Sequence, residues 1–201
     1  MKTTILTIAI ALSTLVGISQ TTYAVTGNNR QVTRLTDISN ISEIEVRGNV
    51  QLYLSDGSTN EVKVYNNYYS ESALVQDENG VLRITSYSSQ KLVVWVTVNQ
   101  LAKLSAYDSA EVKSFGKLSS IDLDVKLFNN ASAKLDMDTF TAAISLDGFT
   151  KADLTGRITE GNIRYTHSSF LNIAGLDVTH LIKTVKFHKM DRIHQREFAA
   201  L

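Results

Sequence analysis

The chain has 201 residues, of which 20 are basic and 20 acidic, so its formal net charge at neutral pH is zero. This balance excludes the strong positive field with which proteins concentrate nucleic acid, and nucleic acid is not an expected partner. The chain contains no cysteine, which excludes disulfides, thiolate nucleophiles and zinc–thiolate sites, and no proline, which suits a backbone committed to hydrogen-bonded ladders.

The N-terminus has the pattern of a secretory signal peptide. A basic residue precedes an apolar run over residues 5–18, and residues 22–24 form a small-residue cleavage site. The run is interrupted by polar residues and is shorter than the ~20 residues of a membrane-spanning helix. We therefore expect the signal peptide, residues 1–24, to be cleaved after Ala24. Residues 25–201 should form one exported domain without a transmembrane segment.

Short segments of alternating apolar and polar residues follow, and each predicts a strand with one buried face. These segments are Ile44–Val46, Val50–Leu54, Val62–Val64, Val81–Ile84 and Leu92–Val98. Turn signals separate them, such as the Glu-Asn-Gly at residues 78–80, where Asn and Gly tolerate positive φ. The chain is therefore predicted to be predominantly β, with an irregular connection over residues 65–73.

From about residue 100 the strands become periodic. Pairs of apolar markers eight residues apart recur, and the second markers are Val112, Leu135, Leu154, Ile173 and Ile193. These markers advance by 23, 19, 19 and 20 residues, which places an insertion of four residues near residues 115–121. A unit of about 19 residues is too short for a strand–helix–strand crossover, so it favours strands that stack directly on one another in a parallel β-solenoid.

Alternation in these units predicts which side chains face the core. The inward set is Ala110, Val112, Ala133, Leu135, Ala152 and Leu154. One outward column should read Glu111, Lys134, Asp153 and Asn172, and the next should read Lys113, Asp136 and Thr155. Opposite charges would then be cross-strand neighbours, each pair contributing a few tenths of a kcal/mol.

Several of these motifs together carry a family resemblance. They are Ile44–Gly57, Val62–Val64, Asn79–Ile84, Val94–Val98 and the turns of the repeats, and they cover about residues 40–180. In these motifs the chain resembles the family of putative auto-transporter adhesin head domains, the GIN or DUF2807 domain. Where that family's turns typically read Gly-Ser-Gly, residues 108–110 read Asp-Ser-Ala, as in a divergent member.

The resemblance implies an all-β fold, a right-handed parallel β-helix (β-solenoid) with rungs of about 19 residues, in a protein exported by bacteria. Residues 181–201 fit the repeat pattern less well than the preceding units. We expect them to form a C-terminal cap, because a solenoid must cover the open backbone of its last rung.

Tyrosines are the predicted ligand contacts. Tyr65, Tyr68 and Tyr69 lie in the irregular connection, near Tyr87. Exposed tyrosine rings suit contact with a glycan or a protein, because one end is apolar and the other can hydrogen-bond. The alternative is that these rings cover the end of the β fold.

Acidic and imidazole side chains offer other candidate sites. The carboxylates that a carbohydrate-active enzyme would use are Asp122, Asp124, Asp136 and Asp138. Interspersed lysines favour instead a solvated, charge-compensated face. The four histidines, His167, His180, His188 and His194, match no metal-binding spacing, and the chain has no Gly-x-Ser-x-Gly elbow. No catalytic residue, cofactor site or metal site is predicted.

The sequence thus predicts a non-enzymatic protein of the periplasm, the outer surface or the medium. Its expected role is adhesive, envelope-binding or structural, with a glycan or an envelope protein as partner. Two alternatives stay open. One is a carbohydrate-active enzyme, a polysaccharide lyase or hydrolase acting through the acidic face, and the other is an accessory partner of envelope or signalling proteins.

Overall fold

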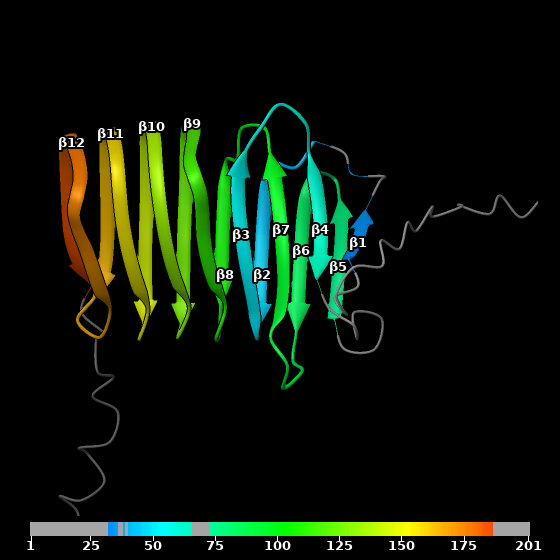
Figure 1. The fold of residues 1–201 in the computed structure, drawn as a ribbon. Coiled ribbons are helices and arrows are strands. Elements are labelled where there is room, and N and C mark those ends of the chain that lie inside the picture. The colour runs from blue at the N-terminus through cyan, green and yellow to red at the C-terminus, as the bar shows by residue number, and fades with distance from the viewer. Residues whose placement is uncertain (1–31, 36–37, 39, 66–72, 187–201) are drawn as a thin grey trace, which may run out of the picture.

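The computed structural model describes residues 32–35, 38, 40–65 and 73–186. Within these residues the protein consists of twelve β-strands joined by turns (Figure 1). The strands, in chain order, are β1 (Val32–Leu35), β2 (Glu43–Gly48), β3 (Val50–Asp56), β4 (Glu61–Tyr65), β5 (Ala73–Glu78), β6 (Val81–Ser86), β7 (Leu92–Val98), β8 (Lys103–Tyr107), β9 (Glu111–Asn129), β10 (Ser132–Gly148), β11 (Lys151–Thr166) and β12 (Phe170–Lys186).

All of these strands belong to one sheet, and β9 is the place where the sheet turns back on itself. The first part of β9 pairs in parallel with β3, where Gln51 is opposite Glu111. Its second part pairs in parallel with β8, where Lys103 is opposite Asp124. Two arms therefore leave β9: the first arm is β3, β7, β4 and β1, and the second arm is β8, β2, β6 and β5. Strand β9 also pairs with β10, which is followed by β11 and β12.

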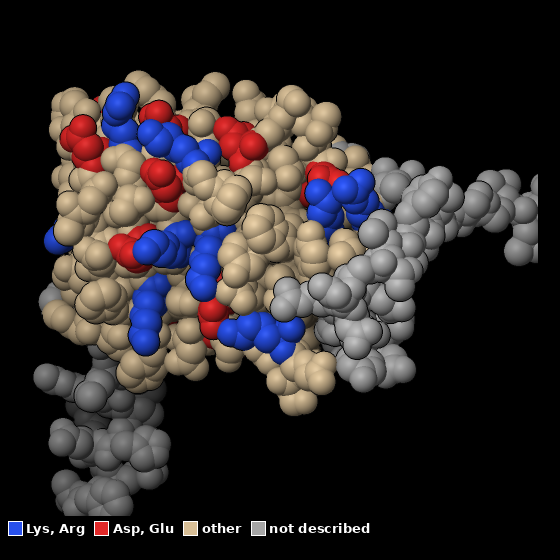
Figure 2. Space-filling view, viewed as in Figure 1, with Lys and Arg blue, Asp and Glu red and all other residues tan. Residues whose placement is uncertain are grey.

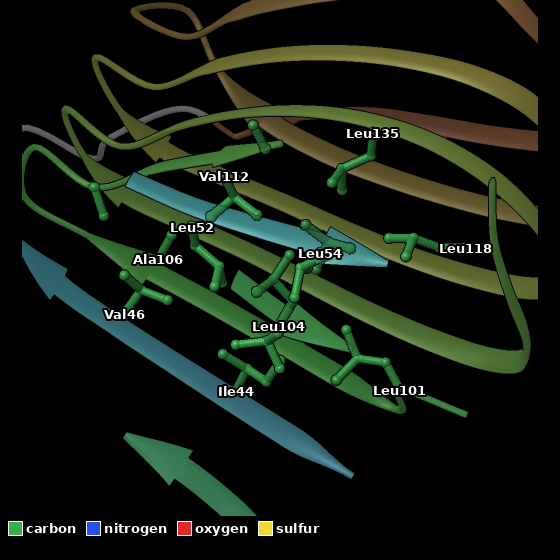
Figure 3. Packing of buried hydrophobic residues seen from close by; sticks show 14 of the residues in the cluster. Ile44, Val46, Leu52, Leu54, Leu101, Leu104, Ala106, Val112, Leu118 and Leu135 are labelled. Carbon is green, nitrogen blue, oxygen red and sulfur yellow. The ribbon is translucent and has the colours of Figure 1, made fainter. Parts of the chain in front are cut away.

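The two arms face each other across the hydrophobic core. Alternation along β2 and β3 buries every second residue. Leu52 and Leu54 of the first arm are fully buried and pack with Ile44 and Leu104 of the second arm (Figure 3). Removing one such side chain from water contributes about 1.5–3 kcal/mol, so the shared burial of the two arms stabilises the curled sheet.

A tight turn makes the end of the second arm antiparallel. Asn79 and Gly80 both have positive φ, at 52° and 79°, as a two-residue turn of type I′ requires. This turn joins β5 to β6 in a hairpin where Glu78 is opposite Val81. The first arm also ends in antiparallel pairs, of β7 with β4 and of β4 with β1.

These antiparallel pairs show that the predicted fold class is wrong. The protein is all-β, but it is a curled, half-barrel sheet of mixed strand direction and not a right-handed parallel β-helix with rungs of about 19 residues. The prediction failed because it extended the parallel pairing expected after residue 100 to the whole chain. An Asn-Gly dipeptide between two alternating segments is a hairpin signal, and a hairpin requires antiparallel strands.

The repeated segments after residue 100 form β9 to β12, which pair side by side in parallel. The six side chains predicted to face inward are all buried, namely Ala110, Val112, Ala133, Leu135, Ala152 and Leu154. The outward column is partly as predicted, since Lys134 is opposite Asp153 and Asp153 is opposite Asn172. Its first step is wrong, because Glu111 is opposite Ser132 and not Lys134.

The insertion in β9 is smaller than predicted, which explains that wrong step. Lys113 pairs with Lys134, and Lys117 pairs with Asp136, so residues 114–116 of β9 stand opposite Leu135 alone. The second outward column had placed Asp136 beside Lys113. In the structure Asp136 is instead beside Lys117. The insertion near residues 115–121, which the marker spacing predicted to have four residues, is a bulge of two extra residues within one long strand, and it begins before residue 115.

One predicted segment, and part of another, lie outside the described residues. These are the signal peptide, residues 1–24, and residues 187–201 of the predicted cap. Residues 181–186 of that cap form the end of β12. Among the residues that the structure describes, no helix has the length and hydropathy of a membrane span.

Candidate functional site

Two neighbouring strands of the first arm carry aromatic side chains on their outer face. In β3, Tyr53 stands between the buried Leu52 and Leu54, so alternation turns its ring outward. Trp95 has the equivalent position in β7, between two buried valines. Because Tyr53 is directly opposite Trp95, the rings stack, with their centroids 4.6 Å apart and their planes at 24°.

The bulge in β9 adds a third ring. The side chain of Phe115 is 66% exposed, and its ring centroid lies 5.5 Å from that of Trp95, with the two planes at 57°. We call Tyr53, Trp95 and Phe115 the aromatic cluster. The inclined ring of Phe115 beside the stacked pair forms an apolar corner open to solvent, a shape suited to contact with the apolar face of a ligand.

Basic side chains lie on both sides of the aromatic cluster. Lys63 of β4 is opposite Trp95, and Lys113 of β9 is opposite Tyr53. Figure 2 looks onto this face of the molecule and shows blue side chains on either side of an uncharged strip over β3 and β7. The face therefore combines apolar rings with charged hydrogen-bond donors, the mixture that small-molecule and sugar sites use to bind and orient a ligand.

The predicted tyrosine contacts are only partly within the described residues. Tyr65 is the last residue of β4, not part of a loop, and lies opposite Val93 on the same outer face as Trp95. Tyr68 and Tyr69 lie outside the described residues. Tyr87, which we expected nearby, follows β6 of the second arm and is 73% exposed. The structure thus places Tyr65 on the face of the aromatic cluster and Tyr87 on the other arm.

The acidic residues considered for carbohydrate chemistry each lie beside a neutral or basic partner. They are Asp122, Asp124, Asp136 and Asp138, on β9 and β10. Asp136 is opposite Lys117, which also pairs with Asp138 at 4.0 Å, and Asp124 Oδ2 is 2.6 Å from Lys126 Nζ. Within the described part of the chain, no group of three or more His, Asp or Glu residues could hold a metal ion. Asp124 therefore lies on the side of the second arm and Asp136 on the side of the first, each beside a lysine, so the four carboxylates do not gather into one acidic face.

Two of the four histidines are described. His180 Nδ1 lies 2.9 Å from Glu160 Oε1 of β11, and both side chains are at least half exposed. His167 is exposed in the turn before β12. His188 and His194 lie outside the described residues. The contact between His180 and Glu160 is an exposed surface pair, whose contribution to stability is small.

A groove of about 230 Å³ crosses β9, β10 and β11 on the side of the second arm. Its charged and amide side chains bond to one another: Lys126 pairs with Asp124, and Arg164 Nε donates to Asn162 Oδ1 at 3.4 Å. No aromatic residue is among those that line it. The charged and amide groups of the groove are therefore engaged with one another, and the groove lacks the exposed rings that the aromatic cluster presents.

A second pair of stacked rings lies on the side of the second arm, and an arginine side chain covers it. The rings of Tyr107 and Phe128 stack with centroids 4.7 Å apart and planes at 6°. The guanidinium carbon of Arg47, which is opposite Tyr107 on β2, lies 3.8 Å from the centroid of the tyrosine ring. The ring of Tyr107 thus contacts Phe128 and the guanidinium of Arg47, which lie on neighbouring strands. These contacts within the protein occupy its ring faces.

One lysine of the second arm has a shifted pKa. The hydrogen bond that Lys103 Nζ donates to Glu43 Oε1, at 2.5 Å, raises the pKa of Lys103 above its ordinary value. Partial burial lowers this pKa, and the nearby carboxylates of Glu45 and Asp124 raise it further. This lysine is therefore held in its charged form as part of a network across β2, β8 and β9, and it is not an amine suited to act as a base.

The family model described as "Putative auto-transporter adhesin, head GIN domain" (DUF2807) matches residues 40–186. The chain belongs to this family. The match confirms the resemblance seen in the sequence and extends to the last residue of β12, so this GIN domain includes the whole aromatic cluster. No curated protein matches the chain significantly.

Solved structures share the fold of this GIN domain. A putative adhesin from Parabacteroides distasonis is 16% identical with a TM-score of 0.60, and the alignment covers 78% of each chain. A putative adhesin from Parabacteroides merdae is 14% identical with a TM-score of 0.60, over 80% of each chain. A protein from Parabacteroides distasonis described as a putative lipid binding protein is 11% identical with a TM-score of 0.51, over 80% of this chain and 98% of that one.

The three rings of the cluster were not among the predicted contacts of the GIN domain, although the sequence holds a signal for two of them. Tyr53 and Trp95 each stand at the outward position of a segment predicted to be a strand with one buried face, so their rings could be expected on the surface. Phe115 could not be found in this way, because its exposure depends on the bulge in β9.

Proposed function

We propose that this GIN domain is a non-enzymatic adhesive module of the cell envelope that binds a glycan through the aromatic cluster. The observation that carries the proposal is the exposed ring of Phe115, inclined against the stacked Tyr53 and Trp95. A sugar ring has an apolar face and a rim of hydroxyl groups. The cluster offers an apolar corner for the face, and its neighbours offer hydrogen-bonding groups for the rim.

Hydroxyl groups next to the cluster support a sugar ligand. Ser55 Oγ and Thr97 Oγ1 lie 2.9 Å apart, two residues beyond Tyr53 and Trp95 on the same face. Tyr65 ends the neighbouring strand on this face and is a further proposed contact. Because these groups stand on paired strands of a sheet, they are held in place before a ligand binds, which lowers the entropy cost of association.

A pair of phenylalanine variants tests the proposal. Phe115→Ala removes the inclined ring from the cluster, whereas Phe149→Ala removes a ring that is 72% exposed in the turn between β10 and β11. Loss of a ring at the centre of a binding surface typically costs more than 1 kcal/mol, so we expect Phe115→Ala to weaken glycan binding about tenfold. Phe149→Ala should bind as the wild type does. The assay is retention on a glycan array, followed by titration calorimetry with the best glycan.

The possible results separate three kinds of partner. Glycan binding that is lost in Phe115→Ala alone supports the proposal. An empty array together with one envelope protein that co-purifies in a Phe115-dependent way would replace the glycan with a protein partner. Glycan binding that survives Phe115→Ala and also the milder Trp95→Phe would move the binding site away from this face.

We propose an extracytoplasmic location for the same module. The support is the signal-like pattern of residues 1–24 and the description of the family as an adhesin head. Fractionation of cells that express the full chain, with protease added to intact cells, tests this location. A protein recovered from the cytoplasm with its N-terminus intact would contradict it.

A further inference from the structure

The charges beside the aromatic cluster are unevenly shared. On the side of β4, the carboxylate of Glu61 holds two cations, Lys63 at 2.6 Å and Arg34 at 3.4 Å. On the side of β9, the carboxylate of Glu111 also holds two cations, Lys91 at 2.5 Å and Lys113 at 3.9 Å. Each flank therefore carries one positive charge in excess, with the uncharged rings in between.

Two lysines on the β9 side are placed as like-charged neighbours. Lys113 is directly opposite Lys134 of β10, a cross-strand arrangement that destabilises a sheet. Each also has an acidic partner: Glu111 lies 3.9 Å from Lys113, and Asp153 lies 3.5 Å from Lys134. The lysine side chains are 43% and 70% exposed, so both ammonium groups can reach a ligand. An anion bound between them would relieve the repulsion.

Other acids on this face do not cancel the excess. Asp136 lies two residues beyond Lys134 on β10, but it is opposite Lys117 and so belongs to the next group of charges. Asp138 also pairs with Lys117. The row that crosses the cluster, from Arg34 through the rings to Lys134, remains cationic on both sides.

We propose that the ligand of this face is an acidic polysaccharide, whose carboxylate or sulfate groups contact Lys113 and Lys134 on one side of the cluster and Arg34 and Lys63 on the other. Lys63 and Lys113 are separated by three strand spacings, about 14 Å. A single anionic group cannot span that distance, whereas a linear chain laid across the strands can place a sugar ring against Phe115 and an acid group on each flank. This inference rests on the proposed glycan-binding function and names its substrate class.

Two pairs of polymers distinguish charge from sugar backbone. Polygalacturonate is compared with its methyl ester, and dextran sulfate with dextran, each in titrations with the purified full chain. We expect the acidic member of at least one pair to bind about tenfold more tightly than its uncharged parent, and we expect this preference to fall as NaCl is raised from about 50 mM to about 500 mM.

Matched double variants locate the charges. Lys113→Gln with Lys134→Gln should weaken binding of the acidic polymer about tenfold and leave binding of the uncharged parent unchanged. The control is Lys103→Gln with Lys126→Gln, which removes two lysines of the second arm and of the groove, each held by an acid. Thermal melting should show the first double variant to be about as stable as the wild type, because it removes a like-charge pair together with two exposed ion pairs of small value.

Three results would overturn the inference. If both members of each pair bind equally and Phe115→Ala still abolishes binding, the glycan function stands but its ligand is neutral. If the control double variant loses as much affinity as the test variant, the attraction is general or lies in the groove. If none of the four polymers binds, the assignment of an acidic polysaccharide is wrong. The glycan array with the Phe115→Ala variant then tests the proposed glycan-binding function by itself.

Discussion

Gly156 allows a sharp test of how closely β10 and β11 approach each other. Its φ is +102°, and a Cβ atom at this residue would lie 2.0 Å from the carbonyl oxygen of Met137 and 2.8 Å from Met137 N. Ordinary van der Waals contact lies between 3.4 and 4 Å. Because the atoms in the way belong to the backbone of the paired strand, Gly156→Ala must push the two strands apart.

The expected cost has two parts. An L-residue forced into positive φ costs about 1–2 kcal/mol. Separation of the strands weakens the ladder hydrogen bonds on either side of Met137, at about 1 kcal/mol for each bond. We therefore expect Gly156→Ala to lower the free energy of unfolding by about 3–5 kcal/mol. In a domain of this size that loss lowers Tm by about 6–20 °C.

Gly116 provides the matched control. Its φ is +81°, but a Cβ atom there would meet nothing within 4 Å. Gly116→Ala therefore carries only the backbone cost, about 1–2 kcal/mol. Urea denaturation followed by circular dichroism measures both losses. Equal losses in the two variants, or an unchanged stability in Gly156→Ala, would refute the close approach of the two backbones.

Three further predictions concern the core, the bulge and pH. Leu135→Ala opens a cavity at a fully buried position and should cost about 2–5 kcal/mol in urea denaturation; a loss below 1 kcal/mol would mean that the site collapses. Ser114→Ala removes the hydroxyl that accepts a 2.8 Å hydrogen bond from Asp136 N, so the same assay should show a loss of about 1–2 kcal/mol, and no loss would mean that water replaces it. The hydrogen bond to Glu43 raises the pKa of Lys103 above 10.5, so the stabilisation is complete below that pH and is lost as the pH rises through the higher folded-state pKa. As the pH rises above 10.5, the wild type should thus lose more stability than Lys103→Gln, and parallel pH curves would contradict this.

Local pattern was enough to predict many strands and the direction of their side chains. The alternating segment Leu92–Val98 has the same bounds as β7, and Val81–Ile84 lies within β6. These predictions hold because alternation is a property of the strand itself: one face must be buried whichever strand becomes its partner. The family was recognisable for the same reason, since its motifs are local.

Strand pairing was not predictable in the same way. One part of β9 pairs with β3 and another part pairs with β8. No local pattern in Glu111–Asn129 predicts that the strand has two partners. The register between β9 and β10 depends on where the extra residues bulge, and marker spacing reveals only that they exist. Direction is set by connections, and the turn at Asn79 and Gly80 holds that information for β5 and β6.

The candidate site shows the same division. Trp95 is the single tryptophan of the chain and stands at the outward position of a strand, so attention to alternation would have selected it. Its stacking with Tyr53 needs the pairing of β3 with β7, and its contact with Phe115 needs the bulge. Sequence reasoning instead selected a group of tyrosines that are close in the chain, of which Tyr65 is described and lies on this face.

Among the described residues the sheet has three edge strands, β12, β1 and β5, and they differ in how they would receive another strand. In the described residues β12 pairs only with β11, and its inward side chains Leu171, Ile173, Leu176 and Val178 are half-buried, whereas Leu154 and Ile158 one strand away are completely covered. The opposite ends are the short antiparallel strands β1 and β5. A backbone edge of 17 residues is a template for strand addition, and a short edge is not. A strand added by a duplicated segment or by a neighbouring molecule would therefore find a longer backbone ladder at β12 than at β1 or β5.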